Sequence, residues 1–384
     1  MGELALKVVH VDINGWVYGV QKYVINFCKE LNRIGGYRSI VVWPSGEYLN
    51  ALRTENIPVV PIQDHWKKID TDPAGWLRLY HVVKREEPRI IHSHGTKENI
   101  ISRIIGRLLG IPVVPVYHCN HRQFGRRDNG IRFKRRIYEA IYLDVLERLT
   151  SYFSVENIAV SHSVRNNIRK FGIPDRKIRV IYSGINVDDF GVEEPTPAEK
   201  TDKVRIVSVS RIDESKGIID IINAAKMIKE KGCSFEINFV GDGPLLKECR
   251  HLVNKYRLDT EITFLGYMKN VKEILLSSDV FVSASYSEGL PINIVEALSC
   301  GLPVVVTGAG GIKEIVDHQV NGLIVDTDAP EQLKEALLLM IGDSNLREKY
   351  GRRGRQKVLE RFGIHRMISD YMNLYNAINE RRTN

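Results

Sequence analysis

The chain has 384 residues, of which 43% are hydrophobic and 27% charged, and its formal net charge is +8. This balance is typical of a globular protein of two or three domains, and it excludes a collagen, a mostly disordered chain and a small disulfide scaffold. The five cysteines are scattered without any C-x-x-C pair, which favours reduced thiols. The sequence also lacks a signal-peptide pattern and any apolar run of about 18 residues, so we expect a cytoplasmic protein.

In the first half, short apolar runs alternate with amphipathic segments. Strands are predicted at 6–11, 39–43, 90–92, 112–117, 152–160 and 178–182, and helices at 20–31 and 98–109. In the helix over 98–109, isoleucines and leucines spaced by three and four form one face, and Arg103 and Arg107 lie on the other. This alternation predicts a parallel sheet covered by helices on both sides.

A polar stretch with two prolines over 188–200 separates this part from a second alternating series. Its predicted strands are 205–209, 236–240, 261–265, 280–284, 303–307 and 322–325. Its predicted helices are 218–231, 244–256, 271–278, 292–299, 312–318 and 330–340, followed by a long charged helix over about 345–381. We therefore predict an α/β chain with a domain over 1–188, a linker over 189–203, a second domain over 204–360 and a C-terminal helix over 361–384 that crosses back to the first domain.

The positive charge is concentrated in the first half, where basic residues exceed acidic ones by ten over residues 1–190. Its densest stretch contains Arg122, Arg126, Arg127, Arg132 and Arg135. Two interpretations stay open: a solvated helix face, or a surface that meets anions such as lipid head groups or a phosphorylated acceptor. Interleaved apolar residues would let this stretch lie against an anionic membrane. No nucleic-acid-binding motif accompanies the charge, so we expect no nucleic-acid partner.

Basic residues and glycines follow the first two predicted strands of the second domain. Arg211 and Lys216 lie five residues apart after strand 205–209, a pattern that suits a diphosphate but is also common in surface loops. Gly241 opens a Gly-Asp-Gly-Pro turn after strand 236–240. The third glycine of a dinucleotide fingerprint is replaced by Leu246, so an ordinary turn explains this segment equally well.

Two glutamates flank a predicted helix start. Glu288 follows strand 280–284 and precedes Leu290-Pro291, and Glu296 lies two turns into the helix. Carboxylates accept hydrogen bonds from sugar or ribose hydroxyls, and the free N–H groups of a helix start bind phosphate. The alternative is that Glu288 caps the helix and that Glu296 is an ordinary buried or surface residue.

Together these segments resemble the family 4 retaining glycosyltransferases, which have the GT-B fold. Glu288 and Glu296 match the family's E-x7-E motif, and further matching segments occur in family order over about residues 204–326. They are Ser210-Arg211, Lys216-Gly217, Val240–Pro244, Glu296-Ala297-Leu298, Gly301–Val305, Gly310-Gly311 with Glu314, and Asn321-Gly322. The first half matches more loosely, at 91–95 and 181–186. The resemblance implies two Rossmann-like open parallel-sheet domains facing a central cleft, the first binding the acceptor and the second the nucleotide sugar.

The resemblance also implies roles for individual residues. Arg211 and Lys216 bind the donor diphosphate and stabilise the leaving group, Glu288 holds hydroxyls of the donor sugar, and Glu296 holds the ribose. His118 lies near the reacting sugar. The other residues implied at the donor site are Gly241, Tyr267, Met268, Gly289 and Leu290.

The loop after the first strand departs from the family pattern. Tyr18 stands where the first glycine of a Gly-Gly pair is expected, and Gly19, which is retained, can approach a phosphate or the acceptor. Two sequences, Asp70–Asp72 and Asp326–Asp328, have the D-x-D form of a metal site. Turn and helix-cap roles are sufficient for Asp326–Asp328, and Arg211, Lys216 and the helix dipole can neutralise a diphosphate without a metal. We therefore expect neither a metal nor another cofactor, because the nucleotide sugar is a co-substrate.

The expected activity is transfer of a hexose from a nucleotide-diphosphate sugar, with UDP favoured, to a saccharide or lipid-linked acceptor. The transfer retains the anomeric configuration, forms an α-linkage and serves cell-surface polysaccharide or glycolipid synthesis, with peripheral contact to the cytoplasmic membrane face. Two alternatives stay open: a GT-B epimerase or phosphorylase acting on nucleotide sugars, and a non-catalytic basic scaffold.

Overall fold

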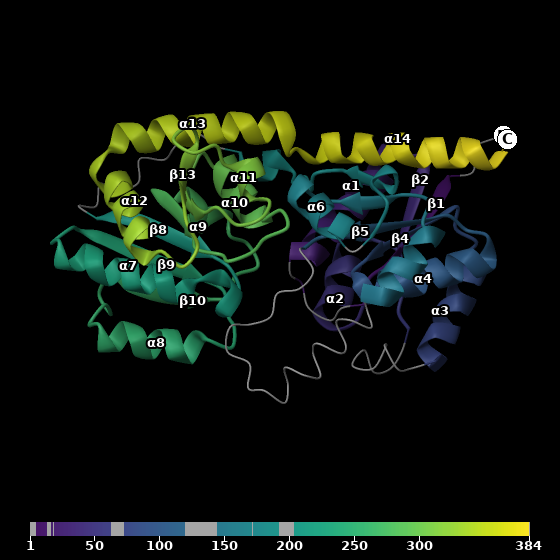
Figure 1. Cartoon of the computed structure of the whole chain (residues 1–384), viewed down its shortest axis with the longest axis horizontal. Helices are drawn as coiled ribbons and strands as arrows, with labels where there is room; N and C mark the ends of the chain where they lie inside the picture. Colours follow the sequence, from purple (N-terminus) through teal and green to yellow (C-terminus); the bar gives the residue numbers. More distant parts are fainter. Residues whose placement is uncertain are drawn as a thin grey trace. The chain divides into compact units, whose positions relative to one another are not determined.

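The structure, a computed structural model, describes residues 5–13, 17, 19–62, 73–119, 144–170, 172–191 and 203–383. Its described residues form two compact units (Figure 1). Of the described residues, unit 1 contains those up to Gly184 and those from Ile364 onwards, and unit 2 contains those from Ile185 to Gly363. Within the described ranges the chain therefore passes between the units at 184–185 and at 363–364.

Unit 1 is built on a seven-stranded parallel sheet with the strand order β3-β2-β1-β4-β5-β6-β7. The strands are β1 (Leu6–Val11), β2 (Tyr37–Val42), β3 (Val59–Val60), β4 (Ile90–His94), β5 (Val113–Tyr117), β6 (Asn157–Ala159) and β7 (Ile178–Val180). Every residue of β4 and β5 is buried, as expected for central strands covered on both faces. The register of β1 and β4 places His10 opposite His92.

Helices cover both faces of this sheet. They are α1 (Gly19–Ile34), α2 (Gly46–Thr54), α3 (Pro73–Glu86), α4 (Thr96–Leu109), α6 (His162–Lys170) and α14 (Ile364–Thr383). Helix α14 packs along α1 on one face, and α3 and α4 lie on the other face (Figure 1). The Tyr23 hydroxyl of α1 donates a hydrogen bond to the Tyr371 hydroxyl of α14 at 2.8 Å, so the last helix of the chain is anchored to the first.

Two predictions for this unit are wrong. Arg103 of α4 was expected on the exposed face of its helix, but it is fully buried. Its guanidinium group pairs with Glu147 at 2.9 Å and donates to Asn157 at 2.7 Å, partners that helical periodicity cannot reveal. The strand predicted over 152–160 is only β6, because Tyr152 and Phe153 belong to a 3-10 turn and are about half exposed.

Unit 2 contains a six-stranded parallel sheet with the strand order β10-β9-β8-β11-β12-β13. The strands are β8 (Val204–Val209), β9 (Phe235–Val240), β10 (Ile262–Gly266), β11 (Val280–Ser283), β12 (Val304–Thr307) and β13 (Gly322–Val325). The helices are α7 (Ile218–Glu230), α8 (Leu246–Lys255), α9 (Lys272–Leu276), α10 (Ile292–Ser299), α11 (Ile312–Ile315), α12 (Pro330–Gly342) and α13 (Ser344–Arg361). Both units are therefore Rossmann-like open α/β sheets, as predicted.

The C-terminal segment is not the single long helix predicted over 345–381. It is broken between α13 and α14 at Phe362 and Gly363. Phe362 is fully buried, and its carbonyl accepts a hydrogen bond from the Ile185 N–H at 3.0 Å. The tail therefore pairs with the first crossing segment at the point where it leaves unit 2. Within the described part of the chain, no helix is long and apolar enough to cross a membrane.

Candidate functional site

The strand order of unit 2 reverses between β8 and β11, and ligands of open α/β sheets bind at the carboxyl ends of strands near such a point. Lys216 lies in the loop after β8, in a 3-10 turn over Glu214–Lys216, and Glu288 lies in the loop after β11. The Lys216 ammonium donates to Glu288 Oε1 at 2.6 Å. Both side chains keep part of their surface exposed. The structure thus brings together a cation and a carboxylate that lie 72 residues apart.

Arg211 lies in the same loop as Lys216. Its Nε is 2.9 Å from Asp213 Oδ2, and half of its side chain is exposed. Asp213 also caps the 3-10 turn, because it accepts hydrogen bonds from the Ser215 N–H at 2.9 Å and from the Ser215 hydroxyl at 2.6 Å. A guanidinium group has five N–H donors, so the ion pair leaves donors that can bind a phosphate.

Two glycines allow the loops at this edge to approach one another. Gly217 has φ +61°, and a Cβ there would overlap the carbonyl of Ala284 at the end of β11. Gly241 has φ +138°, and a Cβ there would overlap the carbonyl of Ser210 after β8. The close packing of the loop after β9 against the loop after β8 therefore explains why a glycine is needed at position 241.

Predicted site residues also follow β10, the edge strand beside β9. The Gly241 N–H donates to the Gly266 carbonyl at 2.8 Å, which joins the loop after β9 to the end of β10. Tyr267 and Met268 follow directly, and Tyr267 is 55% exposed. Because adjacent strands are about 4.8 Å apart, the edge from β10 to β11 spans roughly 14 Å.

Helix α10 begins two residues after Gly289-Leu290 and carries Glu296, which is 7% exposed. Glu296 lies near Cys300, where burial, with a contribution from the Glu296 charge, raises the pKa of the thiol to about 12. Gly289 and Leu290 are buried as well, so Glu288 is the more exposed of the predicted residues on this segment.

Two side chains that the sequence analysis did not single out hold the Glu288 loop in place. The Asn293 side-chain amide donates to the Val209 carbonyl at 2.6 Å and joins α10 to the end of β8. The Tyr286 hydroxyl donates to Asp220 at 2.8 Å, and its N–H donates to the Ser215 carbonyl at 2.9 Å. Both residues lie within or beside the predicted E-x7-E segment, a position that could have drawn attention to them.

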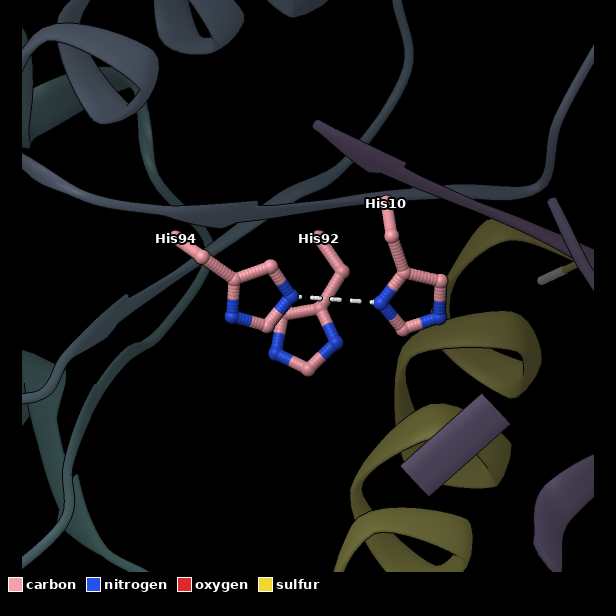
Figure 2. A group of neighbouring side chains, drawn as sticks. All are labelled: His10, His92 and His94. Atoms are coloured by element: carbon pink, nitrogen blue, oxygen red, sulfur yellow. Dashed lines mark hydrogen bonds between the residues drawn. The ribbon is translucent and has the colours of Figure 1, made fainter. Parts of the chain in front are cut away.

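In unit 1, His118 follows β5, at the carboxyl edge of the sheet, and is partly buried. Its Nε2 is hydrogen-bonded to His94 Nδ1 at 3.1 Å, and His94 Nε2 is hydrogen-bonded to His10 Nδ1 at 3.2 Å. His92 lies beside His94 and His10 (Figure 2). Its Nδ1 is hydrogen-bonded to the Tyr375 hydroxyl at 2.8 Å. Burial lowers the pKa of all four histidines, so the rings are neutral at physiological pH.

Two carboxyl groups at the same edge also escaped the sequence analysis. Asp12 follows β1, is buried, and accepts hydrogen bonds from the Gln21 side chain at 3.2 and 3.3 Å. Glu98 lies in the first turn of α4. Burial raises the pKa of Asp12 to about 7 and that of Glu98 to about 8. Because β1 and β4 flank the point where the strand order of unit 1 reverses, these two residues lie at the position where such a sheet binds ligands.

One group of described side chains has the composition of a metal site. His10, His92 and His94 place one ring nitrogen each within 4.8 Å of one another (Figure 2). The closest pair, His10 Nδ1 and His94 Nε2, is already joined by a hydrogen bond. Asp326, from one D-x-D sequence, accepts a hydrogen bond from the Gln332 side chain at 3.0 Å. The expected absence of a metal stays a prediction.

The remaining predicted residues are less informative. Gly19 is the first residue of α1 and is exposed. Tyr18 and the basic residues Arg122, Arg126, Arg127, Arg132 and Arg135 lie outside the described residues, as does the D-x-D sequence at 70–72.

Comparison with known proteins connects both units to sugar transfer. Residues 17–189 match the family described as glycosyltransferase family 4, and residues 191–357 match the glycosyl transferases group 1. An Escherichia coli UDP-Gal:α-D-GlcNAc-diphosphoundecaprenol α-1,3-galactosyltransferase is 26% identical over 388 residues, covering 96% of each chain. A Campylobacter jejuni N,N'-diacetylbacillosaminyl-diphospho-undecaprenol α-1,3-N-acetylgalactosaminyltransferase is 25% identical over 356 residues, covering 88% of this chain and 90% of that protein.

The fold has close counterparts among solved structures. Anabaena HepE, crystallised with UDP, superposes with a TM-score of 0.82 at 18% identity, over 97% of this chain and all of that one.

Proposed function

Because the chain belongs to the family 4 glycosyltransferases, which have the GT-B fold, we propose that it is a retaining hexosyltransferase. It takes a hexose from a nucleoside-diphosphate sugar, preferably a UDP-sugar, and forms an α-linkage to a saccharide or lipid-linked acceptor. The contact between Lys216 and Glu288 at the switch point of unit 2 is the observation that carries the proposal. It supports the proposal because a cation can bind a diphosphate and an adjacent carboxylate can accept hydrogen bonds from sugar hydroxyls.

The donor diphosphate binds to Lys216 and Arg211. A lysine ammonium has three N–H donors, so Lys216 can keep its bond to Glu288 and still donate two to phosphate oxygens. Negative charge grows on the diphosphate as the glycosidic bond breaks, and cations already in position stabilise that charge more in the transition state than in the ground state. Glu288 accepts hydrogen bonds from sugar hydroxyls and fixes the position of the ring.

The nucleoside lies along the edge of the same sheet. Glu296 holds the ribose hydroxyls, Tyr267 and Met268 line the base, and backbone groups near Gly289 and Leu290 bind the sugar or phosphate. Gly241 lets the backbone of its loop stay close to the diphosphate. The UDP bound to HepE and the UDP-Gal in the name of the Escherichia coli relative favour uracil as the base.

The acceptor binds to unit 1. The carboxyl edge of its sheet carries Asp12, Glu98 and His118, and Gly19 begins the helix that follows β1. The names of both relatives describe a diphosphoundecaprenol-linked sugar, which favours a lipid-linked saccharide in cell-surface polysaccharide or glycolipid synthesis. The arginine-rich stretch at 122–135 then contacts the anionic lipid surface, with the protein peripheral on the cytoplasmic face of the membrane.

Sugar transfer from labelled nucleotide sugars to synthetic polyprenyl-diphosphate saccharides tests this proposal. We expect transfer from a UDP-hexose, an α-linked product by NMR, and activity that persists in EDTA. Lys216→Ala and Glu288→Gln should each lower kcat/KM by about 100-fold or more, because each removes a charged group from the transition state.

The matched controls are Lys229→Ala and Glu261→Gln. This pair lies in the same unit with its charged atoms 2.9 Å apart, but Glu261 precedes β10 and is therefore at the opposite edge of the sheet. Activity within about twofold of wild type is expected for both. Equal losses in the two pairs would contradict the assigned site. Isomerisation of the donor, or its cleavage by phosphate without an acceptor, would instead indicate an epimerase or a phosphorylase.

A further inference from the structure

A chain of three imidazole rings leads from the carboxyl edge of unit 1 into its core. His118 is bonded to His94, and His94 is bonded in turn to His10, with N···N distances of 3.1 and 3.2 Å. The second of these bonds is the dashed line in Figure 2. His94 thus uses both of its ring nitrogens within the chain, and His118 uses only its Nε2. The nitrogen of His118 that is left for a ligand is Nδ1.

The three hydrogen-bonded imidazole rings can carry their protons in only two arrangements. Burial keeps all three rings neutral, and a neutral imidazole has one N–H donor and one bare acceptor nitrogen. Each ring must therefore donate in the same direction along the chain. Either the donors point from His118 towards His10, which leaves Nδ1 of His118 bare, or they point from His10 towards His118, which leaves Nδ1 of His118 protonated.

The buried end of the chain distinguishes the two arrangements. His10 is fully buried, and its Nε2 has no hydrogen-bond partner among the described residues. The Phe27 ring packs against His10 with 5.2 Å between the ring centroids, so His10 contacts an apolar side chain. A buried N–H group without a partner is rarer in proteins than an acceptor without one, so the proton belongs on Nδ1 of His10. With the proton on His10 Nδ1, both hydrogen bonds among the three rings are donated in the direction of His118.

The neighbouring polar groups do not interrupt the chain. Tyr23 packs edge-on against His118 with 4.8 Å between centroids, but its hydroxyl donates to Tyr371. His92 contacts both His10 and His94 through its ring, and its own Nδ1 is bonded to Tyr375. His92 is as buried as His10 and His94 but is not one of the three hydrogen-bonded rings.

We propose that His10 and His94 are positioning residues that hold His118 as an Nδ1–H donor to an oxygen of the acceptor that binds to unit 1. This assignment rests on the proposed transferase function. It makes His118 a fixed hydrogen-bond donor to a hydroxyl or phosphate oxygen and excludes a role as general base, because its free nitrogen already carries a proton.

NMR spectra of the full chain labelled with ¹⁵N-histidine test the assignment without any substrate. We expect His118, assigned through His118→Gln, to be the Nδ1–H tautomer in the wild-type protein. His10→Leu removes the first donor of the chain and should give a mixture of His118 tautomers. In His10→Asn the side-chain amide can donate in place of Nδ1 and should restore the single tautomer. His92→Leu is the matched control, because it makes the same change in the same cluster outside the chain.

Steady-state kinetics provide the second measurement. His10→Leu should lower kcat by about tenfold and leave KM within about twofold of wild type. A tenfold loss of activity is typical when a hydrogen-bond partner that orients a functional histidine is removed. His10→Asn should recover most of that loss, and His92→Leu should stay within about threefold of wild type. If His10→Leu does not fold, the tautomer of His118 in the wild type and in His10→Asn still decides between the two proton arrangements.

Three results would overturn the assignment. The first is an Nε2–H tautomer of His118 in the wild-type protein, and the second is an equal effect of His10→Leu and His92→Leu on that tautomer. The third is one transition-metal ion per purified chain that both variants lose, since the cluster would then be a metal site. Absence of sugar transfer by the wild type would contradict the proposed function alone, because the tautomer is measured without substrate.

Discussion

At the scale of single residues, a buried charge stabilises the protein only through its partners. Arg103 lies at the centre of a network that includes the Glu147 carboxylate, the Asn157 amide oxygen and the hydroxyls of Tyr117 and Ser154. Removing Arg103 leaves the buried Glu147 carboxylate without its cation, which costs more than the ion pair contributes by itself.

Arg103→Ala should therefore lower the free energy of unfolding of unit 1 by about 3–5 kcal/mol. Tryptophan fluorescence during urea unfolding measures this directly, because all four tryptophans lie within residues 1–122 and report on unit 1. The double variant Arg103→Met with Glu147→Gln should recover much of the loss, because no buried charge remains unpaired. Arg107→Ala, four residues later on the exposed side of α4, is the control and should change stability by less than about 0.5 kcal/mol. Equal effects at the two arginines would contradict this account.

At the scale of elements, the geometry of the carboxyl edge of the unit 2 sheet depends on how closely three loops approach one another. The loop after β8 contacts the end of β11 at Gly217 and the loop after β9 at Gly241. Asn293 and Tyr286 then join the segment around α10 to the β8 side. Lys216 meets Glu288 because these backbone contacts fix both loops before any ligand binds.

Gly217→Ala tests the close approach. The glycine has φ +61°, and the added Cβ would overlap the backbone carbonyl of Ala284, which cannot move without displacing β11. Gly232→Ala is the matched control, since Gly232 has φ +75° with open space around it and suffers the backbone strain alone. We expect the control to cost about 1–2 kcal/mol and Gly217→Ala to cost about 1–3 kcal/mol more. Urea unfolding followed by circular dichroism, with donor binding by calorimetry, measures both; similar values for the two variants would refute the steric explanation.

At the scale of the whole molecule, buried histidines and carboxyl groups with shifted pKa values gather in unit 1. Unit 1 contains four histidines whose pKa burial lowers, those of His10 and His118 to about 3. It also contains two carboxyl groups whose pKa burial raises, Asp12 to about 7 and Glu98 to about 8. These two sets of groups act on stability in opposite directions as pH changes.

Unit 1 should therefore be most stable near pH 6.5. As the pH falls below that value, the unfolded chain binds protons on four histidines while the folded chain holds two on the carboxyl groups. The free energy of unfolding therefore falls, by about 2.7 kcal/mol per pH unit near pH 5, and more steeply once the unfolded carboxyl groups also bind protons. Above it only the two carboxyl groups matter, and because the folded state holds their protons, stability falls as pH rises towards 8. Urea unfolding followed by tryptophan fluorescence between pH 4.5 and 8.5 measures the curve. Asp12→Asn should weaken the fall on the alkaline side, and an unchanged alkaline limb in that variant would contradict the assignment.

Sequence patterns predict most of the fold because buried parallel strands are nearly continuous apolar runs. Strands β1 and β13 and helix α10 have the predicted limits, and most other predicted strands of unit 2 differ by a residue or two. The short β3 and the helices α2, α3 and α6 were not predicted, since β3 has two residues and each of these helices has only two or three buried residues. The break at Phe362 was missed because helical periodicity continues on both sides of it.

The amino-acid sequence alone was enough to establish the two open parallel sheets, the family and the presence of cationic and acidic residues in the loops after the strands, because these depend on local apolar runs and on the residues that directly follow them. The contact between Lys216 and Glu288, which are 72 residues apart, came only from the tertiary structure. Tertiary structure alone decided the burial of Arg103, the acidic pair Asp12 and Glu98, the position of α14 on α1 and the imidazole chain. The physical reason is sequence separation. His10 and His94 are 84 residues apart and Tyr23 and Tyr371 are 348 apart, and such contacts form only when the sheet places β1 beside β4 and the last helix packs against the first.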